Sequence, residues 1–197
     1  VVINIGGISN FTFLEGEKNI FASDIGPGNS LIDKLCVEYF QKDFDRGGKL
    51  AKKGNLNPKH IEELENKKIF KKKFPISFDS KDFDLKNFYF RDLNEYDNLR
   101  TLTYLTAKII SNLKKRLSKN INYWVFSGGG TKNSTMMSDL RKLLKNEIIF
   151  VSDDLGYHSS FIESSAFAYI SIRTMINLPS AFPNTTGCSK KNICGEI

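Results

Sequence analysis

The chain has 197 residues, of which 40% are hydrophobic and 26% are charged, as in an ordinary globular protein. This length suits one domain with a sizeable core, and the absence of any run of 18 apolar residues argues against a membrane span or a membrane partner. The three cysteines are an odd number without the spacing of a metal site, which favours reduced thiols and a cytoplasmic location. Metal ligands cannot be assigned from the sequence.

The net charge of +7 raises the hypothesis of nucleic-acid binding. The lysines, however, lie in short clusters at 67–73, 114–116 and 190–191, with few aromatic side chains between them for base stacking. We therefore expect no nucleic-acid partner. A non-enzymatic basic binding module stays as an alternative interpretation.

The first 23 residues predict three strands. Residues 1–5 form a β-branched run typical of a buried strand, and residues 10–15 and 19–23 predict the second and third strands. Gly6 and Gly7 lie between the first two strands. Without a Cβ, the backbone at these glycines can turn tightly and approach a ligand closely.

A second glycine-bearing turn, residues 26–29 (GPGN), leads into an amphipathic helix that begins near Leu31. The first N–H groups of a helix have no intrahelical partner, so a glycine turn at this place favours phosphate binding. The same residues are also ordinary turn chemistry before a helix capped by Asn29 or Ser30. Two such turns on one small sheet make phosphate binding the preferred interpretation.

The middle of the chain is less regular. Residues 43–54 predict a loop with a short helical turn, residues 58–70 predict a helix, and residues 74–96 have no clear period. We therefore expect an irregular insert at about 56–96. Apolar residues at three- and four-residue steps then predict a long amphipathic helix over 98–119.

A third glycine-bearing junction follows this helix. The aromatic, β-branched strand 121–127 ends in three glycines, 128–130, before a helix at 136–144. A strand at 147–151 and a helix at 160–177 complete the pattern. The last helix is apolar nearly all round, which predicts burial on more than one side.

Glu163 is the carboxylate of this last helix. With Ser160 it fits a capping box, in which the two side chains bond to the backbone of the first turn. Glu163 could equally face a cleft and accept hydrogen bonds from substrate hydroxyls. The residues alone leave both interpretations open.

The order of predicted elements is β-β-β-α, the insert, then α-β-α-β-α. This order indicates an α/β fold with a ribonuclease H-like mixed sheet and flanking helices. The glycine junctions lie at strand ends, where such sheets bind ligands. This layout resembles one lobe of the actin-like ATPase fold, in which two lobes hold a nucleotide.

Motifs along the whole chain resemble those of the anhydro-N-acetylmuramic acid kinases. They are NIGGISN (4–10), DIGPGN (24–29), LID (31–33), DNLRTLTYLTA (97–107), SGGGTKN (127–133), ESSAFA (163–168) and the tail LP to TG (178–187). The match is weak over about 56–96, where PISFDS (75–80) replaces the family's usual PKSTGR. Ligand contacts are therefore not carried over to that segment.

The resemblance implies an enzyme that uses ATP and Mg²⁺ to phosphorylate the 6-hydroxyl of 1,6-anhydro-N-acetylmuramic acid, while water opens the anhydro ring. The product would be N-acetylmuramic acid 6-phosphate, in peptidoglycan recycling. The implied site residues are, for ATP, Asn4, Gly6, Gly7, Asn10, Gly128, Gly129, Gly130 and Asn133; for the phosphate and sugar cleft, Asp24, Gly26, Gly28 and Asn29; and for the sugar, Glu163. Another sugar or acetate-type kinase, or an actin-like ATPase of the same superfold, is the alternative.

Two parts of the family pattern are missing from these 197 residues. Family members have a first phosphate loop of the GTSLDG type and a water-activating aspartate upstream of the NIGGIAN strand. We therefore expect residues 1–197 to be a single C-terminal lobe without its N-terminal lobe, with no catalytic base of its own and little activity alone. The family's tendency to dimerise implies a homodimer as a further expectation.

Overall fold

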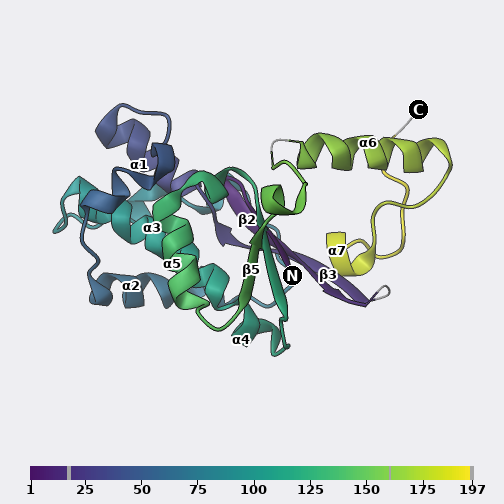
Figure 1. The fold of residues 1–197 in the computed structure, drawn as a ribbon, viewed down its shortest axis with the longest axis horizontal. Coiled ribbons are helices and arrows are strands. Elements are labelled where there is room, and N and C mark those ends of the chain that lie inside the picture. Colours follow the sequence, from purple (N-terminus) through teal and green to yellow (C-terminus); the bar gives the residue numbers. More distant parts are fainter. Residues whose placement is uncertain (17–18, 160, 196–197) are drawn as a thin grey trace.

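The computed structural model describes residues 1–16, 19–159 and 161–195. Its centre is a five-stranded mixed sheet with the strand order β3-β2-β1-β4-β5 (Figure 1). The strands are β1 (Val2–Ile5), β2 (Ile8–Glu15), β3 (Asn19–Pro27), β4 (Tyr123–Ser127) and β5 (Ile148–Val151). β1 pairs antiparallel with β2 and parallel with β4. This arrangement confirms the predicted α/β class and the ribonuclease H-like mixed sheet.

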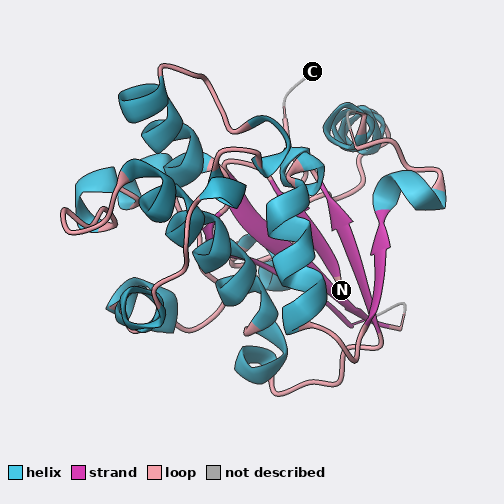
Figure 2. Ribbon diagram, turned by 60° about the vertical axis from the view of Figure 1, so that its left-hand side comes forward, coloured by secondary structure: helices cyan, strands magenta, loops and turns pink. Residues whose placement is uncertain are grey.

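Helices surround the sheet unevenly. They are α1 (Ser30–Phe40), α2 (Pro58–Glu65), α3 (Glu95–Ser111), α4 (Leu113–Leu117), α5 (Ser134–Leu143), α6 (Ile162–Met175) and α7 (Pro183–Thr186). Figure 2 shows that most of the helical turns gather on one side of the sheet. In the part of the chain that the structure describes, no helix has the length and apolarity needed to cross a membrane.

The two faces of the sheet differ because side chains alternate along a strand. On β1, Ile3 and Ile5 are fully buried, whereas Val2 and Asn4 on the opposite face are partly exposed. The core packs between this buried face and the helices α1, α3 and α5; its fully buried side chains include Phe11, Trp124, Phe126, Leu35, Leu99, Leu105 and Leu140. The opposite face carries partly exposed polar side chains such as Asn4, which a ligand can contact.

Most predicted elements form, with shifted bounds. The helix predicted over 98–119 is divided, since α3 ends at Ser111 and α4 ends at Leu117. The helix predicted over 58–70 ends at Glu65 and is followed by a separate 3₁₀ turn. β3 is longer than the predicted strand and continues to Pro27.

The segment 56–96 has one α-helix, α2, before α3 begins, and it is well packed. Besides α2 it forms 3₁₀ turns whose phenylalanines are buried together, with Phe70, Phe78 and Phe88 around Phe83. Because its apolar contacts come from aromatic side chains at irregular spacing, neither a helical nor a strand period reveals them. The segment fills space beside α1 and β3.

The prediction that the last helix is buried on more than one side is wrong for this structure. In α6, Phe167 and Met175 are each 69% exposed. Figure 1 shows α6 at one end of the molecule, set apart from the sheet. The helix is held by the chain that follows it: Arg173 donates to the Pro179 carbonyl at 2.8 Å, and Thr174 donates to the carbonyl of Cys194.

Candidate functional site

The two N-terminal glycine turns lie against each other. The N–H groups of Gly28 and Ser30 donate to the Gly7 carbonyl at 2.9 and 3.1 Å, and the Asn29 N–H donates to the Gly6 carbonyl at 2.8 Å. Three N–H groups of the second glycine turn, including the first of α1, are therefore bonded within the protein. Phosphate binding by this turn stays a prediction.

Neither expected cap holds the beginning of α1. Asn29 is in the N-cap position, but its side-chain amide donates across to the carbonyls of Gly6 (3.1 Å) and Ile5 (3.4 Å). The hydroxyl of Ser30 is buried and has no hydrogen-bond partner among the described residues. Asn29 instead ties the second turn to the first.

Gly26 and Gly28 are packed closely by other parts of the protein. Gly26 lies inside β3, where an added Cβ would clash with the side chains of Ile109 and Phe70. An added Cβ on Gly28 would clash with the carbonyl of Gly6. Both glycines are buried. Gly7 faces solvent, and no neighbouring atom lies within 4 Å of the position that an added Cβ would occupy.

The third glycine junction lies beside the first turn, as the fold requires. β1 and β4 are parallel neighbours, with Asn4 opposite Ser127. Gly128 has φ +85°, and it contacts Asn4 and Ile5 so closely that any side chain would clash. Gly129 is exposed, with open space at its Cβ position.

Asn133 ends this junction and begins α5. Its side-chain oxygen accepts a hydrogen bond from the Met136 N–H at 3.0 Å, an N-cap. The next two residues hold the loop after α1: Ser134 donates to the Gly47 carbonyl and Thr135 donates to the Gly48 carbonyl, both at 2.7 Å. The loop predicted over 43–54 is therefore bonded to the residues that follow the glycine junction.

A pocket of about 330 Å³ opens between these elements, and we call it the α1–α5 pocket. It is lined by Asn29, Ile32, Asp33, Asp43, Phe44, Asp45, Gly47, Gly129, Lys132 and Asn133. It therefore contains three of the predicted site residues and a set from 33–47 for which the sequence predicted no role. Burial raises the pKa of the Asp33 carboxyl to about 6.

A second pocket, of about 440 Å³, lies on the more open face of the sheet, and we call it the β2–β3 pocket. It is lined by Asn10, Phe11, Thr12, Ala22, Ser23, Asp24, Pro75, Ile76, Ser77, Thr185, Thr186 and Gly187. Burial raises the pKa of Asp24, and the hydrogen bond that its carboxylate accepts from the Phe78 N–H at 2.7 Å opposes this shift. The segment 75–78, which departs from the family pattern, thus contacts a predicted site residue.

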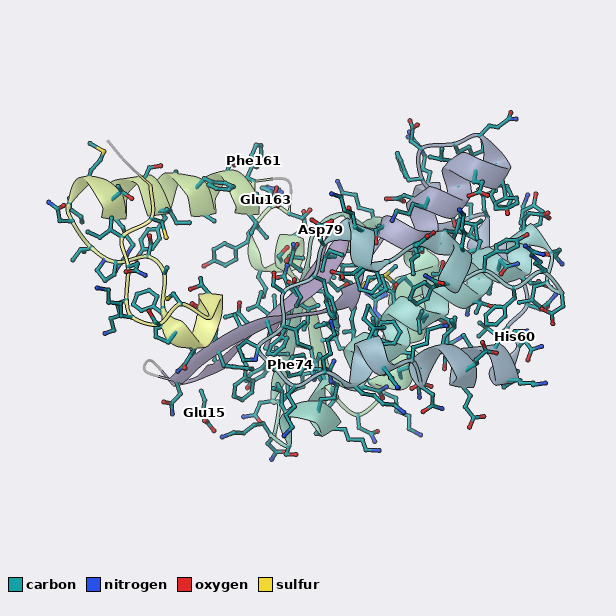
Figure 3. All side chains as sticks on the ribbon, turned by 180° about the vertical axis from the view of Figure 1, so that it is seen from behind. Glu15, His60, Phe74, Asp79, Phe161 and Glu163 are labelled. Atoms are coloured by element: carbon teal, nitrogen blue, oxygen red, sulfur yellow. The ribbon has the colours of Figure 1, made fainter. Side chains whose placement is uncertain are left out.

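Glu163 is not brought into either pocket. Figure 3 shows it beside Phe161 at the first turn of α6, where its side chain is exposed. Phe161 occupies the N-cap position and makes no side-chain cap, and Ser160 lies outside the described residues. The role of Glu163 stays a prediction. In the described ranges, no three His, Cys, Asp or Glu residues lie together as a ready metal site.

Comparison with known proteins adds a decisive observation. Residues 1–197 match the family described as "Anhydro-N-acetylmuramic acid kinase" along the whole chain. The chain belongs to this family. Anhydro-N-acetylmuramic acid kinases from Rhodopseudomonas palustris CGA009 and Brucella canis are 36% and 34% identical to it, over 94% and 96% of this chain.

The same comparisons show how much of a family member is present. The matched regions cover 50% and 51% of these two relatives, so the chain spans about half the length of the curated kinases that it matches. Among solved structures, the activator of 2-hydroxyisocaproyl-CoA dehydratase from Clostridium difficile with bound ADPNP is similar. It is 20% identical, with a TM-score of 0.46 over 81% of this chain and 55% of that protein.

Proposed function

We propose that this chain is the C-terminal lobe of an ATP-dependent kinase that phosphorylates 1,6-anhydro-N-acetylmuramic acid, with ring opening to N-acetylmuramic acid 6-phosphate. Family membership supports the reaction class. The observation that carries the proposal is the meeting of the β1–β2 turn with the third glycine junction, where Gly128 packs on Asn4 and Ile5. This arrangement brings the two predicted ATP-binding motifs to one place.

In this proposal the phosphates of ATP lie at the open Gly6–Gly7 turn, and the nucleoside occupies the α1–α5 pocket beside Gly129. Phosphoryl transfer depends mainly on positioning and on neutralising the charge of the phosphates, for which backbone N–H groups and a metal are suited. Mg²⁺ is the proposed metal. It is commonly held by one or two carboxylates together with nucleotide phosphates, so it needs no preformed cluster of protein ligands.

The β2–β3 pocket is the proposed place of the sugar. Its volume lies in the range of small-molecule sites, and Asn10, Asp24 and Thr186 offer acceptors and donors for hydroxyl groups. Glu163 remains a proposed sugar contact from α6. The proposed location is the cytoplasm, and the proposed partners are the amino sugar and a second copy of the chain, without nucleic acid or membrane.

The test is a phosphorylation assay with ATP, Mg²⁺ and the anhydro-sugar. It compares the 197-residue chain with the same chain extended by the remaining half of a family relative. We expect turnover from the extended protein and little from the chain alone, because loss of a general base alone lowers rates by about 10²–10⁴. Full turnover from the chain alone would show that the catalytic groups lie within residues 1–197. No turnover in either form, or preference for a different sugar or for acetate, would overturn the proposal.

A binding measurement tests the remaining alternative. If the chain is a basic binding module, it should retain a short oligonucleotide at physiological salt. Under the kinase proposal, any retention at low salt should disappear at physiological salt, because scattered lysines make only weak, screened contacts.

A further inference from the structure

The α1–α5 pocket combines three kinds of surface. Phe44 presents an aromatic ring that is 48% exposed, Gly129 presents backbone without a side chain, and Asp33 and Asp43 present carboxylates. A ligand that fits all three has a flat face, can approach backbone closely, and carries hydrogen-bond donors. Lys132 also lines the pocket, so repulsion of a phosphate group applies to the part beside the carboxylates.

Several polar side chains of the pocket are already bonded to backbone. Asp45 accepts from the N–H groups of Leu50 (2.8 Å) and Ala51 (2.9 Å). Asn29 donates to the first glycine turn, and Asn133 caps α5. These side chains fix the walls of the pocket and have little capacity left for a ligand.

Asp33 differs from them. Within the described part of the chain its carboxylate accepts no hydrogen bond, and its burial is not offset by a neighbouring cation. A partly buried carboxylate without a donor is unfavourable until a donor reaches it. Asp33 lies in the first turn of α1, one residue after the buried Ile32, so the helix holds it at the pocket wall.

Phe44 is on a loop that cannot move freely. Ser134 and Thr135 bond the carbonyls of Gly47 and Gly48, which fixes the loop to the beginning of α5. The guanidinium of Arg46 lies 5.6 Å from the centre of the Phe44 ring. An exposed aromatic ring on an anchored loop is a suitable stacking surface for a nucleobase, because every base has a π-face.

We propose that Asp33 accepts a hydrogen bond from the ribose 2′-hydroxyl of a nucleotide whose base lies against Phe44, so that Asp33 selects ribonucleotides over 2′-deoxyribonucleotides. This inference rests on the proposed function, which places the nucleoside in this pocket. A carboxylate is well suited to the task, since it accepts hydrogen bonds from hydroxyl groups and cannot donate any when ionised. The same residue type binds the ribose 2′-hydroxyl in dinucleotide-binding folds.

The experiment uses the 197-residue chain, ¹⁵N-labelled, and titrates it with ATP and with 2′-deoxy-ATP while recording amide chemical shifts. EDTA is present, so no metal can bridge the nucleotide to a carboxylate. We expect shifts at Gly129 and nearby amides, with ATP bound about tenfold more tightly than 2′-deoxy-ATP, as one hydrogen bond to a charged group predicts. Asp33→Asn should weaken the binding of ATP about tenfold, so that the ratio of the dissociation constants of 2′-deoxy-ATP and ATP falls close to one. Phe44→Ala should weaken both nucleotides equally.

Glu38→Gln is the matched control, because Glu38 is an exposed carboxylate on the same helix and does not line the α1–α5 pocket. It should bind both nucleotides as the unchanged chain does. The role of Asp33 is overturned, and the kinase proposal stands, in two cases. In the first, Asp33→Asn still binds ATP more tightly than 2′-deoxy-ATP. In the second, Asp33→Asn changes nucleotide binding only when Mg²⁺ replaces EDTA. If ATP shifts no amide around the pocket in the unchanged chain, the nucleoside placement itself is overturned.

Discussion

The buried ion pair between Arg100 and Asp139 should make the helical layer sensitive to the loss of either partner. Arg100 on α3 donates two hydrogen bonds to Asp139 on α5, at 2.6 and 2.8 Å. The side chains are only 13% and 4% exposed, so neither charge is well solvated. The pair joins α3 to the helix whose first turn caps the third glycine junction.

Removing one partner leaves the other charge buried and unpaired. Asp139→Ala should therefore lower the free energy of unfolding by about 3–5 kcal/mol, as for other buried pairs. Because a domain is typically stable by about 5–15 kcal/mol, this is a large share of the total. Replacing both residues by apolar side chains of similar volume, Arg100→Met with Asp139→Leu, should restore most of that loss. Urea denaturation followed by circular dichroism measures each variant.

A surface pair provides the comparison. Lys119 and Glu15 lie 3.1 Å apart, and their side chains are 49% and 50% exposed; Figure 3 shows Glu15 at the far end of the β2–β3 hairpin. Lys119→Ala should cost less than about 1 kcal/mol. The reasoning that an unpaired buried charge causes the loss is refuted if Asp139→Ala costs no more than this control, or if the double apolar variant is as unstable as Asp139→Ala alone.

Other predictions follow from the glycines, Asp33 and α6. Gly7→Val should weaken ATP binding, measured by calorimetry on the extended protein, and leave the melting temperature within a few degrees. Gly28→Val should lower the melting temperature strongly, because a side chain there clashes with the Gly6 carbonyl. Equal melting temperatures for the two variants would contradict the packing role of Gly28. Burial raises the pKa of Asp33 to about 6, above its ordinary value, so its ionisation lowers stability as the pH rises from that ordinary value toward 6. Asp33→Asn should remove that decrease and raise the free energy of unfolding at pH 7.5 by about 1 kcal/mol, a value reduced for the partial exposure of Asp33. If the free energy of unfolding of Asp33→Asn follows the same pH dependence as the unchanged chain between pH 4 and 7.5, this prediction is refuted. Phe167→Ser with Met175→Ser should reduce self-association of the chain in sedimentation, and unchanged association would show that α6 is not the adhesive surface.

Periodicity predicted the sheet and the main helices because each has one buried face. Apolar residues alternate along β1, with Ile3 and Ile5 on the buried face. In α3 they recur at three- and four-residue steps, which also places them on one buried face. Element ends were less predictable. Gly26 and Pro27 look like turn residues, yet β3 continues through them, because Gly26 packs on the insert and on α3 where no other side chain fits.

The candidate site was only partly predictable. The meeting of the first and third glycine junctions follows from a parallel β1–β4 pair, and the sequence indicated both motifs. The α1–α5 pocket was missed because its walls come from three separate segments, and no local pattern shows that the loop 43–47 returns to α5. One signal did exist: Asp33 is a carboxylate in the first turn of a helix, directly after the buried Ile32.

The exposure of α6 and the unsettled role of Glu163 have a common physical origin. Fully burying a large apolar side chain contributes about 1.5–3 kcal/mol, so covering partly exposed residues such as Phe167, Tyr169 and Met175 would contribute several kcal/mol in total. That is comparable with the stability of a whole domain. A surface that covers α6 can therefore determine where the helix lies, more strongly than the few hydrogen bonds that hold it to the chain after Asn177. Because Glu163 is fixed to the first turn of α6, its distance from the β2–β3 pocket depends on that covering surface, and no pattern within the helix itself can determine it.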